Sequence, residues 1–168
     1  FLGRFQGARH IEYDPVSYSA ILDAHQQTHG QRRLPHYRFD LAQVIVSFDA
    51  DFLGTWISPV EFTKDYSSGR TLEGESPQLS HHVQLEGRMS LTGSNADRRI
   101  KVSPDQLFSW LAALSERLAG RLGVDAPLAG STAFDVEEEI LDEITERLLE
   151  ARGKSLVVSG ANDLATQR

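Results

Sequence analysis

The sequence predicts an α/β fold, in which a mostly parallel sheet carries helices on both faces in a three-layer, Rossmann-like arrangement. Three observations support this prediction. Short, continuous apolar runs at 44–48 and 155–159 have the pattern of strands buried on both faces. Strand candidates alternate with amphipathic segments of helical period along the chain. The length of 168 residues suits a single domain of this kind.

Local signals place the elements in chain order. Five strands are expected, near residues 9–13, 44–48, 82–86, 98–102 and 155–159. Helices are expected at about 14–29, 58–67, 104–118 and 135–152. An aspartate or serine followed by proline marks the first three helix starts, because these residues cap a helix and proline suits its first turn. Gly30 and Gly153 mark helix ends.

Composition argues against several classes of function. The formal net charge is −7, from 24 acidic and 17 basic residues, which disfavours nucleic-acid binding. Because the sequence has no cysteine, it holds no disulfide, thiolate zinc site or conventional iron–sulfur cluster. His25 and His29 share a helix face, but two histidines without a third ligand do not predict a metal site. No apolar run approaches the roughly 20 residues that cross a bilayer, so we expect no direct membrane insertion.

The loops that follow the second and third expected strands are the candidate site. Residues 49–59 follow an uninterrupted apolar strand, and residues 87–97 follow the next strand. Parallel α/β sheets bind ligands at the carboxyl ends of their strands. A simpler interpretation is that both loops only turn the chain. No G-x-G-x-x-G, P-loop or G-x-S-x-G motif occurs, and no catalytic residue is predicted.

The two loops, taken with their strands, carry a family resemblance. The sequence reads FDLAQVIVSFDADFLGTWISPV at 39–60 and VQLEGRMSLTGSNAD at 83–97, with YDPVSY upstream at 13–18. This pattern resembles molybdopterin oxidoreductases of the polysulfide and thiosulfate reductase type. In that family the strand-end loops embrace the guanosine and pyrophosphate parts of a molybdopterin guanine dinucleotide.

The resemblance implies six cofactor-binding positions. Asp51 and Trp56 would belong to the first loop, and the remaining four, Glu86, Arg88, Thr92 and Asp97, to the second. The residue types suit such a role, since carboxylates accept hydrogen bonds from ribose and guanine, and arginine pairs with phosphate.

Three departures from the family pattern weaken this site. Asp49 stands where a glycine usually precedes Ala50, so a carboxylate lies where backbone should approach a phosphate. Gly87 replaces the usual proline, and the usual Pro-Gly-Thr-acid turn reads Pro-Asp-Gln-Leu at 104–107. In these departures the sequence is similar to the fused iron–sulfur and molybdopterin-like subunit of alternative complex III. Alternative complex III is a bacterial quinol-oxidising membrane complex. The molybdopterin-like part of that subunit is thought to carry no molybdenum cofactor.

We therefore expect a structural, cofactor-free domain of such an electron-transfer subunit, with iron–sulfur clusters elsewhere in the parent. The resemblance implies as partners the other subunits of a membrane-bound respiratory complex, on the periplasmic side of the bacterial inner membrane. Because the chain begins at Phe1 without an initiator methionine, we expect a piece of a longer subunit. One alternative is a domain of a true molybdoenzyme, acting on polysulfide, thiosulfate or formate, that binds molybdopterin guanine dinucleotide. Another is a free-standing α/β domain that binds a small molecule.

Overall fold

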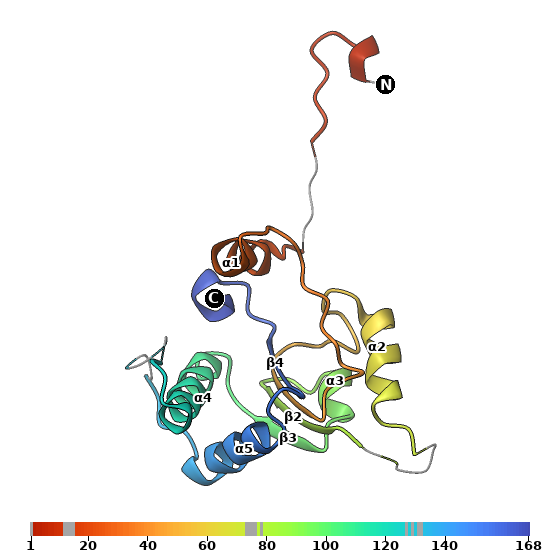
Figure 1. Ribbon diagram of the computed structural model, residues 1–168. Coiled ribbons are helices and arrows are strands. Elements are labelled where there is room, and N and C mark those ends of the chain that lie inside the picture. Colours follow the sequence, from red (N-terminus) through yellow and green to blue (C-terminus); the bar gives the residue numbers. More distant parts are fainter. Residues whose placement is uncertain are drawn as a thin grey trace.

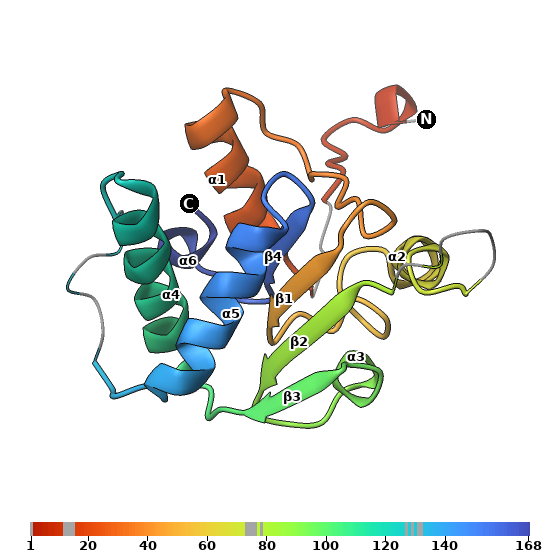
Figure 2. The same cartoon turned by 60° about the horizontal axis from the view of Figure 1, so that its bottom comes forward.

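A parallel sheet forms the centre of the computed structural model, which describes residues 2–11, 16–72, 77, 79–126, 128, 130 and 133–168. Its strands are β1 (Val44–Phe48), β2 (His81–Glu86), β3 (Arg98–Lys101) and β4 (Ser155–Ser159). They lie in the order β3-β2-β1-β4, and every neighbouring pair is parallel (Figure 2). In the register, Val44 of β1 pairs with His81 on one side and with Ser155 on the other.

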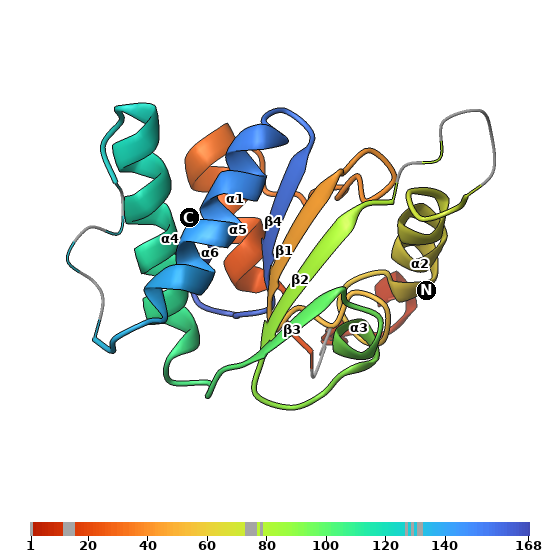
Figure 3. The ribbon, with the colours of Figure 1, turned by 90° about the horizontal axis from the view of Figure 1, so that it is seen from below.

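Helices cover both faces of the sheet. They are α1 (Ser19–His29), α2 (Pro59–Ser68), α3 (Leu91–Ser94), α4 (Leu107–Leu122), α5 (Glu138–Glu150) and α6 (Leu164–Gln167), with a short 3-10 helix at Leu2–Arg4. Helices α4 and α5 lie on one face, and α2 and α3 lie on the other (Figure 3). Helix α1 packs beside α6 near β4 (Figure 1). No helix in the described part of the chain combines the length and apolar character needed to span a membrane.

Alternating side chains of β1 supply both layers of the core. Val44, Val46 and Phe48 pack in one cluster with residues of α4 and α5. Ile45 belongs to the opposite cluster, which contains Phe52 and the side chains of α1 and α2 that face the sheet. Because successive strand residues point to opposite faces, a strand with both faces covered buries all its side chains, and β1 is accordingly apolar except for Ser47. The predicted α/β fold with a parallel sheet and helices on both faces is confirmed.

Three local predictions were wrong. Residues 16–18 of the helix expected at 14–29 are not helical, and α1 begins at Ser19. Residues 9–11 of the predicted first strand are exposed and do not join the sheet, while residues 12–15, including the predicted helix start, lie outside the described part of the chain. An apolar alternation of so few residues does not stabilise a strand without neighbours. Helix α4 begins at Leu107 because residues 104–106 form a turn first, and the Ser103 hydroxyl bonds the Gln106 side chain rather than capping the backbone. The predicted stop at Gly30 is correct, since this residue has φ +70°.

The connections create a switch point between β1 and β4. From β1 the chain proceeds through α2 to β2 and through α3 to β3, on one face of the sheet. It then passes through α4 and α5 on the opposite face and returns to β4, on the other side of β1. Loops leaving the adjacent ends of β1 and β4 therefore diverge, and such a divergence is where open α/β sheets form a ligand crevice.

Candidate functional site

A crevice of about 510 Å³ lies at this switch point. Four segments line it: the start of α1, the loop after β1, the loop after β2 and the loop after β4. Cavities of this size accommodate small molecules. The location agrees with the site expected from the sequence, and the loop after β4 is an addition that the sequence analysis did not include.

Asp51 and Thr92 fasten the first loop to the second. The Thr92 N–H and hydroxyl donate to Asp51 Oδ1 at 3.1 and 2.8 Å, and the Leu53 N–H donates to Thr92 Oγ1 at 2.9 Å. The Thr55 hydroxyl donates to Asp51 Oδ2 at 3.2 Å. Thr92 is completely buried. Both predicted site residues thus hold the loops in place, and most of their hydrogen-bonding capacity is used within the protein.

Glu86 is a buried carboxylate at the end of β2, with a relative exposure of 0%. The Ser90 N–H donates to Oε1 at 3.1 Å and the Ser90 hydroxyl to Oε2 at 2.6 Å, while Arg99 Nε donates to Oε1 at 2.5 Å. Desolvation raises the pKa of Glu86, but the hydrogen bonds from Ser90 and Arg99 outweigh it and hold the pKa below its usual value. Glu86 therefore anchors the loop that follows β2 and does not face the crevice.

Glu86 ends a row of polar side chains on one face of β2, formed by His82, Gln84 and Glu86, all of which are completely buried. Gln84 Nε2 donates to Glu86 Oε2 at 3.3 Å, so its Oε1 accepts from His82 Nε2 at 3.2 Å. His82 Nδ1 lies 3.2 Å from the Tyr66 hydroxyl, which donates its hydrogen to the Asn95 carbonyl at 3.0 Å. Burial lowers the pKa of His82 to about 4, which keeps the ring neutral.

Trp56 and Asp97 are held by contacts within the protein. Trp56 lines the crevice but is only 6% exposed, and its ring packs 4.9 Å from Tyr37, centroid to centroid. Asp97 accepts two hydrogen bonds of 2.7 Å from Arg70 and one of 2.8 Å from the His82 N–H. The hydrogen bonds from Arg70, opposed by desolvation, lower the pKa of Asp97 to about 2. His82 lies near the amino end of β2, so Asp97 is at the sheet edge opposite the crevice.

Arg88 and Asp49 remain available at the crevice. Arg88 is exposed, and neither side chain forms a hydrogen bond or ion pair with any residue that the structure describes. The pKa of Asp49 is raised by desolvation and by the charges of Glu86 and Asp51, and the Arg88 guanidinium opposes this shift. Of the six residues predicted to bind a cofactor, Arg88 alone presents an uncommitted charged group to the crevice.

Backbone strain surrounds the same position. Asp49 has φ +53° and Ile57 has φ +55°, a region that is uncommon for aspartate and unfavourable for a β-branched residue. The Ile57 N–H donates to the Tyr18 hydroxyl at 2.9 Å, which ties the loop to the start of α1. The Asp49 N–H donates to the Leu85 carbonyl at 2.8 Å. Strained residues persist where surrounding contacts hold them, and they are common at binding sites.

Gly160 lets the loop after β4 pass close to the end of β1. A Cβ atom at this position would lie 2.3 Å from the Asp49 carbonyl oxygen and 3.0 Å from Ala50 Cα. A side chain would push the two loops apart, and the crevice lies between them. The sequence signal for Gly160 is its place directly after a parallel strand, which marks it as part of the carboxyl edge of the sheet.

A Gly160→Ala variant should therefore lose about 1–3 kcal/mol of unfolding free energy, the usual cost of overpacking. Chemical denaturation measures this loss. Gly120→Ala is the matched control, because a Cβ there meets no atom within 4 Å and alanine favours the helix. A loss no larger than in the control would contradict the close approach.

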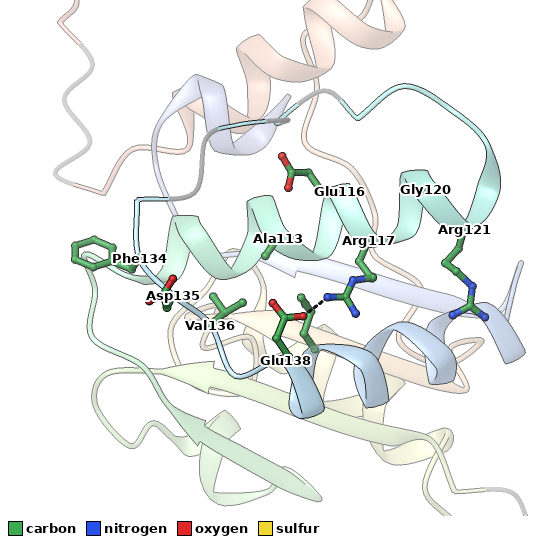
Figure 4. A pocket seen from close by; sticks show the side chains of 10 residues that line it. Ala113, Glu116, Arg117, Gly120, Arg121, Phe134, Asp135, Val136 and Glu138 are labelled. Carbon is green, nitrogen blue, oxygen red and sulfur yellow. Dashed lines mark hydrogen bonds and ion pairs between the residues drawn. The ribbon is translucent and has the colours of Figure 1, made fainter.

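A second hollow, of about 400 Å³, lies between α4 and α5 (Figure 4). Most of its charged side chains pair within the protein: Arg117 pairs with Glu138 and Asp142, and Arg121 pairs with Glu146. Glu116 accepts from the Gly130 N–H. Because these charges are already neutralised across the two helices, the hollow offers a ligand less than the crevice does.

Comparison with protein-family models finds none that matches the chain, and a search of curated proteins finds no match. The residues predicted to bind a cofactor fit a guanine dinucleotide poorly. Asp51, Thr92, Glu86 and Asp97 use their polar groups within the protein, and the Asp49 carboxylate borders the crevice. No group of three or more residues that could hold a metal ion occurs in the described ranges. The rings of His25 and His29 stack on each other, with centroids 4.9 Å apart.

Proposed function

We propose that the chain is a structural, cofactor-free domain of an iron–sulfur-containing, molybdopterin-oxidoreductase-like electron-transfer subunit of a bacterial quinol-oxidising respiratory complex. The loop pattern at 39–60 and 83–97 supports the family, and the Rossmann-like sheet is compatible with it. The observation that carries the cofactor-free role is Asp49, whose carboxylate borders the crevice at the end of β1.

The proposed role also specifies the surroundings of the chain. The iron–sulfur clusters would lie elsewhere in the parent subunit, because this sequence has no cysteine to ligate them. The partners would be the other subunits of the membrane-bound complex, at the periplasmic side of the inner membrane. The domain itself would contribute packing surfaces rather than catalytic groups.

Titration with GDP tests the role of Asp49. A like-charge contact at about 4 Å costs ~1 kcal/mol in water and ~4 kcal/mol at an effective dielectric near 20. Asp49 is exposed, so we expect an intermediate cost of about 2 kcal/mol, and Asp49→Gly should bind GDP roughly thirtyfold more tightly than the unmodified protein. Asp105→Gly, which removes an exposed carboxylate from the loop after β3, should give no gain. Tight GDP binding by the unmodified protein, or an equal affinity in Asp49→Gly, would contradict the proposal.

Arg88 favours the second candidate, a domain that binds molybdopterin guanine dinucleotide in a true molybdoenzyme. Its exposed guanidinium has no ion-pair partner in the described chain and could pair with a pyrophosphate. Elemental analysis of the purified protein separates the two candidates. Stoichiometric molybdenum together with a bound guanine nucleotide would support the second candidate and exclude the first.

A further inference from the structure

Two opposite charges without partners border the same crevice. The Asp49 carboxylate and the Arg88 guanidinium both line it, and both also line a smaller hollow of about 430 Å³ beside it. They form no ion pair with each other within 4.0 Å, yet they interact electrostatically, since Arg88 lowers the pKa of Asp49 against the effects of burial and neighbouring acids. The two charges are therefore near one another but separate.

Most of the other polar side chains at the crevice make internal contacts. Asp51 accepts from Thr92 and Thr55, and the Ser90 hydroxyl donates to Glu86. The Asn162 side chain accepts from the N–H of Ala20 at 3.4 Å. This leaves Asp49 and Arg88 as the charged groups of the crevice with capacity for a ligand among the residues described.

The backbone on either side of the crevice holds the two charges in position. Asp49 is constrained by its hydrogen bond to Leu85 and by the close contact of its carbonyl with Gly160. Arg88 lies two residues before Ser90, which Glu86 anchors through both its N–H and its hydroxyl. A site whose charged groups are attached to anchored backbone loses less entropy when a ligand binds.

Apolar side chains complete the wall. Ile21 and Trp56 are largely buried, and they line the crevice beside the Tyr18 ring. We propose that the crevice binds a zwitterionic small molecule of the amino-acid class, with its ammonium group at Asp49, its carboxylate at Arg88 and its side chain against this wall. The neighbouring acids Asp51 and Glu86 favour a cation at Asp49 and disfavour a ligand with several negative charges. This inference goes beyond the structural role proposed above and does not depend on it.

Equilibrium dialysis with three matched probes tests the proposal. L-phenylalanine carries both charges, 2-phenylethylamine carries only the ammonium, and 3-phenylpropanoate carries only the carboxylate. At neutral pH and low salt, L-phenylalanine should bind saturably at one site, about tenfold more tightly than either single-charge probe. Absence of saturable L-phenylalanine binding, or equal binding of all three probes, would overturn the proposal.

Two variants assign each charge of the probe to its residue. In Asp49→Asn, L-phenylalanine should bind about tenfold more weakly, with the affinity of 3-phenylpropanoate unchanged or higher. In Arg88→Gln, L-phenylalanine should fall to the affinity of 2-phenylethylamine. Asparagine tolerates a positive φ, so the first variant preserves the backbone at this position.

Matched controls remove other charges of the same kind. Asp105→Asn and Lys64→Gln alter exposed side chains that do not line the crevice, and both should retain the full affinity for L-phenylalanine. Thermal unfolding of all four variants checks that the fold is intact. Unchanged L-phenylalanine affinity in Asp49→Asn and Arg88→Gln, or an equal loss in the controls, would show that these charges do not form the site.

Discussion

A Glu86→Gln variant is expected to lose about 3 kcal/mol of unfolding free energy, near the lower end of the usual cost of breaking a buried ion pair. The Glu86 carboxylate is completely buried and bonds Arg99 and both donors of Ser90. The amide has the same shape, but it removes the negative charge opposite Arg99 and one acceptor. Arg99 is then left partly buried without its counter-charge, which costs more than the hydrogen bond itself contributes.

Urea denaturation of the variant measures this loss. Glu146→Gln is the control, since Glu146 pairs with Arg121 between half-exposed side chains, and such surface pairs contribute about 0–1 kcal/mol. A double variant, Glu86→Gln with Arg99→Gln, should recover part of the stability, because the unpaired charge is removed as well. A loss in Glu86→Gln no greater than that in Glu146→Gln would contradict a stabilising role for the buried carboxylate.

Unfolding free energy should also fall by about 3 kcal/mol as the pH is lowered from 6.5 to 4, through His82 alone. The pKa of His82 is about 4 in the folded protein, against 6.5 for an ordinary histidine. Between these values the unfolded chain binds a proton that the folded protein excludes. The stabilisation is therefore fully present above pH 6.5 and is lost as the pH falls toward 4. A protonated ring would carry its charge in a completely buried position, which desolvation disfavours.

Denaturation at a series of pH values, with and without His82→Gln, isolates this contribution. Desolvation lowers the pKa of the neighbouring His81 as well, so part of the total pH dependence should remain in the variant. A His29→Gln variant replaces an exposed histidine and should keep the full dependence. An identical pH dependence in His82→Gln and in the unmodified protein would show that His82 does not titrate as inferred.

The sequence was sufficient to locate the candidate site but not to assign its residues. Continuous apolar runs predicted the positions of β1 and β4. The expectation that β4 is buried on both faces was wrong, because β4 is an edge strand and Val157 is 40% exposed. The loop after β1 was correctly placed at the carboxyl edge of a parallel sheet. The comparison of Asp49 with a glycine of the resembled family stays a prediction. The structure adds that Asp49 has a positive φ, a backbone conformation that glycine adopts most readily.

Most strands and helices were predicted from the sequence alone, because their periodicity is a local property of neighbouring residues. The strand expected at 9–13 and the expected start of α4 were exceptions. The tertiary structure decided which polar side chains of the candidate site have no hydrogen-bond partner inside the described part of the protein. Asp51 meets Thr92 across 41 positions of sequence, and Asp97 turns away from the crevice to bind Arg70, 27 positions earlier. A carboxylate can bind a ligand when its oxygens are not already used by hydrogen-bond donors inside the fold. Those donors come from segments distant in sequence, so a local sequence pattern does not reveal them.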